Sequence, residues 1–169
     1  MDDIASEVGL SRPNVYRYFA DRDDLLMELI TRHARALLVR ARKSTSRLSN
    51  LPDQIVETVL YTAEHARRDP LTRHCIDPDG TSLGRRMIAS GRSEATRAEM
   101  WDPILDAALA NNELPPGLPR SDIHLWLGSV TKMVMRGLED GEGDLRRYRS
   151  ILRRFVVPAF AGANAQVST

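Results

Sequence analysis

The sequence predicts an all-α protein in which a helix-turn-helix is joined by one long helix to a larger helical domain. Apolar residues recur at spacings of three and four along most of the 169 residues, which is the period of an amphipathic helix. Prolines, glycines and asparagines gather between these stretches and mark the turns. We therefore predict a helix-turn-helix domain with its connecting helix at residues 1–46, and a second helical domain at 47–169.

The helix-turn-helix is predicted from two short helical segments that meet at Gly9. Gly9 can adopt the positive φ that a tight turn needs, and Ala5 is small enough for the second helix to cross the first closely. Ser11 is expected to cap the second helix through its hydroxyl, and Pro13 suits the first turn because amides there have no helical partner. Val15 should lie where the two helices meet.

The outward face of the second helix is suited to DNA, because it carries Arg12, Asn14, Arg17 and Tyr18. An arginine can donate two hydrogen bonds to guanine, and an asparagine can pair in a similar way with adenine. Residues 1–47 hold nine basic and seven acidic side chains, and the whole chain has a net charge of +1. A DNA surface therefore has to be a focused patch. DNA binding is favoured over the alternative, a helical hairpin that happens to carry surface arginines.

A longer pattern runs through about the first thirty residues: Ile4-Ala5, Gly9, Val15-Tyr16-Arg17-Tyr18-Phe19, Arg22 and Leu25-Leu26. This pattern resembles the DNA-binding domain of TetR-family (tetracycline-repressor-like) transcriptional regulators. Tyr18 and Arg22 replace a more common histidine and lysine, and both still reach phosphate. The resemblance implies phosphate contacts from Ser11, Tyr16, Tyr18 and Arg22, and base-edge contacts from Arg12, Pro13, Asn14 and Arg17.

The family's DNA-binding domain has a further helix ahead of this pattern, whereas the sequence begins at the second helix. Without that further helix, the side chains of Ile4, Val8, Val15 and Phe19 would remain exposed to water. Each exposed side chain would lower the stability of the fold by about 1.5–3 kcal/mol. We therefore expect either an upstream segment or a start placed at an internal methionine. We also expect weak operator binding until the first helix is restored.

The middle of the chain is predicted as helices separated by proline-containing breaks. The connecting helix spans 21–47, with Asp21 as its N-cap and His33 as a buried histidine in its apolar stripe. The next helix ends at Asp69-Pro70, because a residue before proline avoids helical backbone. A short segment at 71–76 and a loop at 77–82 follow, and a helix resumes over 94–110. Pro103 should kink that helix or mark a fresh start.

Two apolar helices are predicted at about 121–139 and 144–160, the first capped by Ser121. Their apolar stripes are wider than one internal contact requires. In TetR-family proteins the last two helices pair with those of a second subunit, so the resemblance implies a homodimer. The alternative is that both helices serve only the core of one subunit. The expected interface residues are Ile123, Leu127, Val130, Val134, Tyr148, Leu152 and Phe155.

The resemblance also implies a pocket for a small-molecule effector in the second domain, built mainly from the helices before and after the loop at 77–82. Aromatic and sulfur-containing side chains are typical linings of apolar pockets, and a histidine can orient a polar group. Packing in the core is the alternative for each of them. The candidates are Tyr61, His65, Cys75, Met87, Met100, Trp101 and Trp126.

Other kinds of chemistry find little support in the sequence. No pair of His or Cys residues has metal-ligand spacing, and we see neither a glycine-rich phosphate loop nor a nucleophile elbow, so we expect no metal, no cofactor and no enzyme. The lone Cys75 cannot form an intrachain disulfide, which suits a reducing cytoplasm. No apolar run approaches the roughly 20 residues that span a bilayer. We expect no membrane partner.

These observations favour a ligand-responsive repressor whose partners are a double-stranded DNA operator, a small-molecule effector and a second copy of the chain. One alternative is a ligand-independent helix-turn-helix regulator or a DNA-architectural protein, which would lack an internal cavity. Another is an enzyme or a helical interaction module without DNA binding. The polar face of the second helix and the missing catalytic set argue against this last alternative.

Overall fold

The structure is a computed structural model that describes residues 7, 9, 11–76, 82–115 and 117–160. All regular structure in these ranges is helical, which confirms the predicted fold class. The α-helices are α2 (Arg12–Tyr18), α3 (Arg22–Thr45), α4 (Leu51–Ala66), α5 (Pro70–Ile76), α6 (Ser82–Ala89), α7 (Arg92–Ala110), α8 (Arg120–Glu139) and α9 (Leu145–Ile151). A π-helical turn, η1 (Leu152–Val156), and a 3₁₀ turn, η2 (Val157–Phe160), follow.

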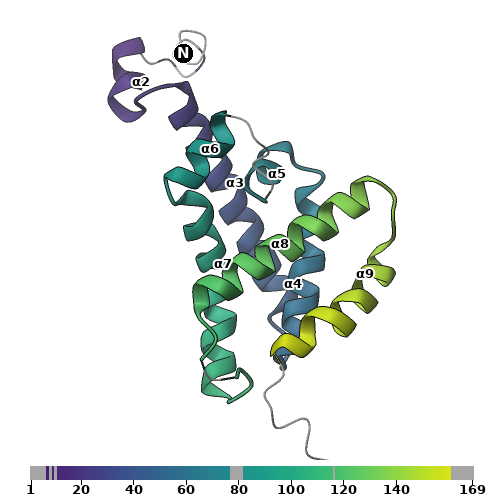
Figure 1. The fold of residues 1–169 in the computed structure, drawn as a ribbon. Coiled ribbons are helices and arrows are strands. Elements are labelled where there is room, and N and C mark those ends of the chain that lie inside the picture. The colour runs from purple at the N-terminus through teal and green to yellow at the C-terminus, as the bar shows by residue number, and fades with distance from the viewer. Residues whose placement is uncertain (1–6, 8, 10, 77–81, 116, 161–169) are drawn as a thin grey trace, which may run out of the picture.

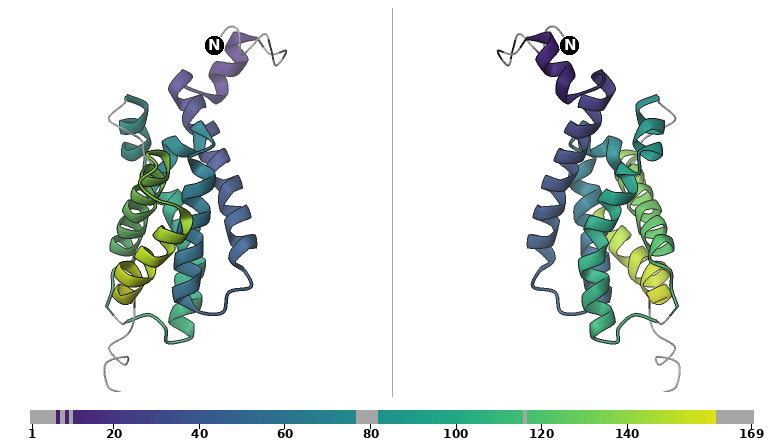
Figure 2. Two further views of the ribbon diagram at one scale, coloured as in Figure 1. Left: turned by 90° about the vertical axis from the view of Figure 1, so that its right-hand side faces the viewer. Right: turned by 90° about the vertical axis from the view of Figure 1, so that its left-hand side faces the viewer.

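The long helix α3 links the two parts of the molecule (Figure 1). Helix α2 lies at one end, beyond the bundle formed by the later helices, and α3 runs from it into that bundle. Helix α4 is central, because α3 packs on one side of it while α8 and α9 pack on the other (Figure 2). A displacement of α3 within the bundle is therefore a displacement of α2.

Apolar packing around α4 forms the main core. Ile55, Val56 and Val59 of α4 are completely buried. Leu127 and Val134 of α8 belong to the same cluster of buried side chains. A second, smaller core lies nearer to α2 and consists of Met27, Ile30, Ala34 and Met87, with Leu71 and Leu83 against it. The small core joins α3 to α5 and α6, so it supports the end of α3 that carries α2.

The N-cap predicted for α3 is confirmed, whereas those predicted for α2 and α8 are not. The Asp21 carboxylate accepts a hydrogen bond from the Asp24 amide at 2.8 Å and caps α3 as predicted. The Ser11 hydroxyl makes no capping bond, so that prediction was wrong; the Ser11 carbonyl instead accepts from the Asn14 and Val15 amides. Ser121 is not a cap either, because α8 already begins at Arg120, after the extended backbone of Pro119.

Two further expectations for the helices need correction in part. Pro103 lies inside α7, which is continuous from Arg92 to Ala110, so it does not mark a fresh start. The predicted last helix is instead α-helical only to Ile151 and then changes to a π turn and a 3₁₀ turn. Pro158 explains this change, because it has no amide to donate and its ring crowds the preceding helical turn.

His33 is not the buried histidine that the apolar stripe of α3 predicted. Its side chain is 47% exposed, and its Nδ1 atom lies 3.2 Å from the Asp69 Oδ2 atom. The stripe on α3 is narrower than the sequence suggested, so His33 falls at its edge, beside the start of α5. Ile4, Ala5 and Val8, to which sequence reasoning gave packing roles, lie outside the described residues.

Candidate functional site

Helix α2 presents nearly all of its side chains to solvent. Val15 is its one buried residue, as predicted, and the remaining positions face outward. Gly9 has the positive φ of 66° that the sequence predicted for the turn before α2. The structure brings all eight predicted DNA contacts together on the exposed surface of α2 and the start of α3: Ser11, Arg12, Pro13, Asn14, Tyr16, Arg17, Tyr18 and Arg22.

Tyrosine rings support two of these arginines. The guanidinium carbon of Arg12 lies 5.5 Å from the centre of the Tyr16 ring. That of Arg17 lies 5.4 Å from the Tyr18 ring, and an Nη atom of Arg17 donates to the Tyr18 hydroxyl at 3.3 Å. Cation–π contacts of this kind restrict the rotamers of an arginine without neutralising its charge. Arg12 and Arg17 therefore keep their positive charge on the face of α2.

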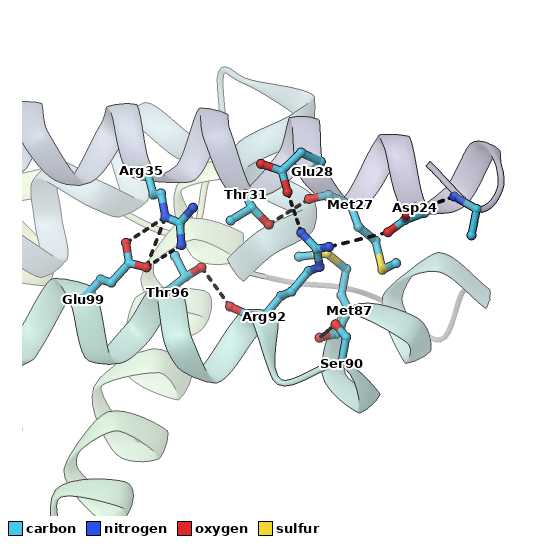
Figure 3. A network of polar contacts seen from close by, with 11 residues as sticks. Asp24, Met27, Glu28, Thr31, Arg35, Met87, Ser90, Arg92, Thr96 and Glu99 are labelled. Carbon is cyan, nitrogen blue, oxygen red and sulfur yellow. Dashed lines mark hydrogen bonds and ion pairs between the residues drawn. The ribbon is translucent and has the colours of Figure 1, made fainter. Parts of the chain in front are cut away.

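The acidic start of α3 is paired with arginines of α6 and α7. Arg86 Nη1 lies 3.0 Å from Asp21 and 3.2 Å from Asp23. The hydrogen bond from Arg86 lowers the pKa of Asp21 below its ordinary value. Arg92 contacts Glu28 at 2.7 Å and Asp24 at 3.5 Å (Figure 3). These pairs offset negative charge that would otherwise repel a phosphate backbone near α2.

A second arginine–carboxylate contact joins α3 to α7 one to two turns further along. Arg35 donates from Nε to Glu99 Oε2 at 2.9 Å and from Nη2 to Glu99 Oε1 at 2.6 Å (Figure 3). This two-pronged geometry favours both charged forms. The hydrogen bond therefore lowers the pKa of Glu99 and raises that of Arg35. Helix α7 thus holds α3 at two points.

A cavity of about 140 Å³ lies between α3, α4, α5, α7 and α8. Its walls are largely apolar, and α7 supplies one continuous face with residues spaced by three and four. Helix α3 lines it directly, only a few turns away from α2. The lining residues are Ala34, Leu37, Leu38, Thr62, Ile76, Ser93, Thr96, Arg97, Met100, Trp101, Leu125, Gly128, Ser129, Thr131 and Lys132.

Residues 1–29 match the family described as "Bacterial regulatory proteins, tetR family". The N-terminal segment of the chain is therefore similar to the DNA-binding segment of the TetR family. Its members are DNA-binding transcriptional regulators, and the polar face of α2 lies in the matched segment. No curated protein matches the chain.

Solved structures share the fold of this chain. The transcriptional regulator FadR from Bacillus subtilis, solved in complex with stearoyl-CoA, has a TM-score of 0.63 and 15% identity over 93% of this chain and 86% of its own. The fatty acid degradation regulator FadR from Bacillus halodurans has a TM-score of 0.57 and 15% identity, covering 90% and 84%. A tetR-family regulatory protein from Rhodococcus RHA1 gives 0.56 and 14%, covering 94% and 84%.

Two of the predicted pocket residues, Met100 and Trp101, line the cavity. Tyr61 and His65 do not; their rings stack at 3.9 Å on α4, and His65 Nδ1 is bonded to the Tyr61 carbonyl oxygen at 2.8 Å. Met87 belongs to the small core instead. The helical period alone could not distinguish residues that line the cavity from residues that pack elsewhere, because both kinds lie on apolar stripes.

Trp126 and Cys75, the two remaining pocket candidates, are not among the described lining residues. Trp126 is 48% exposed, because it lies on the solvent side of α8. The side chain of Cys75 is outside the described part of the structure. Sequence reasoning missed the polar lining residues Thr62, Ser93 and Arg97. A signal for the two on α7 was present in the sequence. Ser93 and Arg97 share one helix face with Met100 and Trp101, because the spacings from these two residues to Met100 and Trp101 are three, four, seven or eight positions.

The predicted dimer residues need the largest correction. Six of them are buried in the core of a single subunit: Ile123, Leu127, Val130, Val134, Tyr148 and Leu152. A side chain that already packs against α4 cannot also face a partner. Only Phe155, which is 68% exposed, is accessible. The exposed apolar side chains on α8 are Leu125, Trp126 and Met133, of which Leu125 also lines the cavity.

In the described ranges, no helix is both long and apolar enough to cross a membrane. The same ranges hold no cluster of three or more His, Cys, Asp or Glu side chains with the geometry of a metal site.

Proposed function

We propose that the protein is a homodimeric repressor that leaves its operator when a small molecule occupies the 140 Å³ cavity. The observation that carries this proposal is the double role of α3. Its Ala34, Leu37 and Leu38 line the cavity, and its N-terminal end continues into the turn after α2. A ligand that displaces this wall of the cavity therefore displaces α2. The domain division at residues 46 and 47 is part of the same proposal.

DNA reading is assigned to the exposed face of α2. Arg12, Pro13, Asn14 and Arg17 contact base edges in the major groove. Ser11, Tyr16, Tyr18 and Arg22 hold phosphates and set the position of the helix. The arrangement supports this division, since all eight side chains are exposed on one end of the molecule. The proposed role is binding rather than catalysis, and it is exerted in the cytoplasm, where a bacterial operator is found.

The dimer surface is assigned to the exposed apolar side of α8 together with η1. Leu125, Trp126 and Met133 fall within one side of α8, and Phe155 of η1 is 68% exposed. Two copies joined there would form an isologous interface. A helix-turn-helix dimer must present its reading helices roughly 34–36 Å apart, so a small displacement of α3 is enough to spoil the fit.

Small-molecule control is supported by the cavity and by the solved FadR structure from Bacillus subtilis, which contains stearoyl-CoA. The coupling required is modest. A free energy of about 1–3 kcal/mol between effector and DNA changes occupancy roughly 5–150-fold. The ion pairs from α7 to α3 give the cavity a second connection to the start of α3, since α7 also lines the cavity.

The proposal is tested by selecting a binding site from random DNA and measuring its affinity by fluorescence anisotropy at fixed salt. We expect a palindromic site, and a dimer by light scattering at micromolar concentration. Trp126→Glu together with Phe155→Glu should give folded monomers, because each charge would be buried at the interface. Recovery of no site by the full protein, with or without ligands, or a stable wild-type monomer, would overturn the proposal.

A further inference from the structure

The cavity contains polar atoms that its own walls leave unpaired. Thr62 Oγ1, Ser93 Oγ and Arg97 Nε are buried, and none has a hydrogen-bond partner among the described residues. A buried polar atom without a partner is costly, so such atoms are nearly always hydrogen-bonded in folded proteins. Three of them on the walls of one cavity point to a ligand with a hydrogen-bonding group at that place.

Two other threonines of the same cavity behave differently. Thr96 donates to the Arg92 carbonyl at 2.8 Å, and Thr131 donates to the Leu127 carbonyl at 2.8 Å. This bond to the carbonyl one turn back is the usual way in which a helical threonine is satisfied. Thr62 and Ser93 also lie in helices, yet their hydroxyls make no such bond. Both remain able to donate to a ligand.

The charge at the cavity favours an anion. Arg97 and Lys132 line it, and no acidic side chain is among the described lining residues. Gly128 of α8 makes room for this arginine, because a Cβ atom at that position would lie 2.8 Å from Arg97 Cδ. A glycine inside a helix is unfavourable relative to alanine, and here its lack of a side chain leaves space for the stem of Arg97. The Arg97 guanidinium can bind both oxygens of a carboxylate.

The remaining walls and the volume limit the rest of the ligand. Leu37, Leu38, Ile76, Met100 and Trp101 form an apolar lining. The cavity of about 140 Å³ is similar to an engineered apolar cavity of about 150 Å³ that binds benzene. A compact apolar body therefore fits within these walls.

We propose that the cavity binds a small carboxylic acid as its anion, with an apolar body of about six to ten carbon atoms. Arg97 holds the carboxylate, and the hydroxyls of Ser93 and Thr62 donate to the same group. The body packs against Met100 and Trp101. This inference rests on the proposed function, in which the acid is the effector that weakens operator binding.

Calorimetry with two matched pairs of probes tests the ligand class: phenylacetate against phenylacetamide, and octanoate against octanamide. Each pair keeps the shape of the apolar body and removes the charge of the head. We expect at least one acid to bind the wild-type protein ten-fold or more tightly than its amide. Equal affinity within both pairs, or binding of none of the four probes, would overturn the inference.

Variants then test the residues. Arg97→Gln should lower the affinity for the acid to that for the amide, and Gly128→Ala should weaken acid binding by displacing the arginine. Thr62→Val should weaken it several-fold. Thr58→Val is the matched control, because Thr58 is also a buried threonine with an unpaired hydroxyl but does not line the cavity. Circular dichroism identifies any variant that fails to fold. Acid binding unchanged in folded Arg97→Gln or Gly128→Ala would contradict the inference.

Operator binding distinguishes this inference from the proposed function. If the protein binds its selected operator but none of the four probes, the ligand class is wrong and the DNA-binding role stands. If an acid binds through Arg97 but leaves operator affinity unchanged, the site is correct and the proposed regulation is wrong. If the acid binds and weakens operator affinity in the wild type but not in Arg97→Gln, both are supported.

Discussion

The hydroxyl of Tyr148 in α9 occupies the space that a Cβ atom on Gly137 in α8 would fill. Tyr148 is buried, and Gly137 is buried with it. The missing side chain allows α9 to approach α8 closely, and the tyrosine fills the space between the helices. This contact fixes how the start of α9 packs against the end of α8.

Replacement of Gly137 by alanine should therefore destabilise the protein. Alanine favours the helix by about 1 kcal/mol, but overpacking costs about 1–3 kcal/mol and here forces Tyr148 to move. We expect a net loss of unfolding free energy in urea denaturation.

A double-mutant cycle isolates this contact. In the Tyr148→Ala background the same glycine change should no longer be harmful. Gly141→Ala is the control, because Gly141 has a φ of 73° and open space around it, so its cost should not depend on Tyr148. Wild-type stability in Gly137→Ala would show that the two helices can separate freely.

Arg92 should hold the start of α3 in place without contributing much to global stability. Arg92→Gln removes its contacts to Asp24 and Glu28, and a partly exposed ion pair of this kind contributes about 0–1 kcal/mol to unfolding free energy. We expect faster amide hydrogen exchange over residues 22–30, measured by mass spectrometry, because the first turns of α3 lose their attachment to α7.

Arg68→Gln is a suitable comparison for that variant. Arg68, just after the end of α4, pairs with Glu64 of that helix, and its side chain is 66% exposed. Exchange over residues 22–30 should stay at the wild-type rate. The same exchange rate in both variants would mean that Arg92 does not restrain α3.

Acid should destabilise the protein through carboxylates such as Glu99. Arg35 lowers the Glu99 pKa below the ordinary value of 4.5, so the folded state binds fewer protons than the unfolded state in acid. The stability from this pair is therefore fully present above pH 4.5 and is lost as pH falls through the folded pKa.

Urea denaturation across this range measures the effect. Glu99→Gln and Arg35→Gln should each flatten the fall in unfolding free energy below pH 4.5 by a similar amount, since either change removes the same pair. An unchanged pH profile in both variants would contradict a role for this contact in acid stability.

Base-edge and phosphate contacts should respond differently to mutation. Asn14→Ala or Arg17→Ala should cost about 1–3 kcal/mol on the selected operator and relax preference at one position in each half-site. Arg22→Ala should weaken binding to all sequences alike and reduce the slope of affinity against salt by about one counterion. Anisotropy titrations at several salt concentrations separate the two classes, and identical behaviour of all three variants would refute the assignment.

Local features of the sequence were sufficient for the all-α class and for the turn that positions α2. The positive φ of Gly9, the burial of Val15 and the Asp21 cap each depend on residues within a few positions of each other. Their conformations follow from short-range steric and hydrogen-bonding rules that hold in any fold. The exposed polar face of α2 follows from the same local geometry.

Only the tertiary structure decided which side of each wide apolar stripe faces the core. Leu127 and Trp126 are neighbours on α8, yet the first is completely buried and the second is 48% exposed, because α4 packs on one side of the helix. Arg97 became a cavity residue in the same way, through the approach of α8 at Gly128. The helical period determines which residues share one face of a helix. Contacts between helices that are distant in sequence determine whether that face packs against the core, lines the cavity or faces solvent.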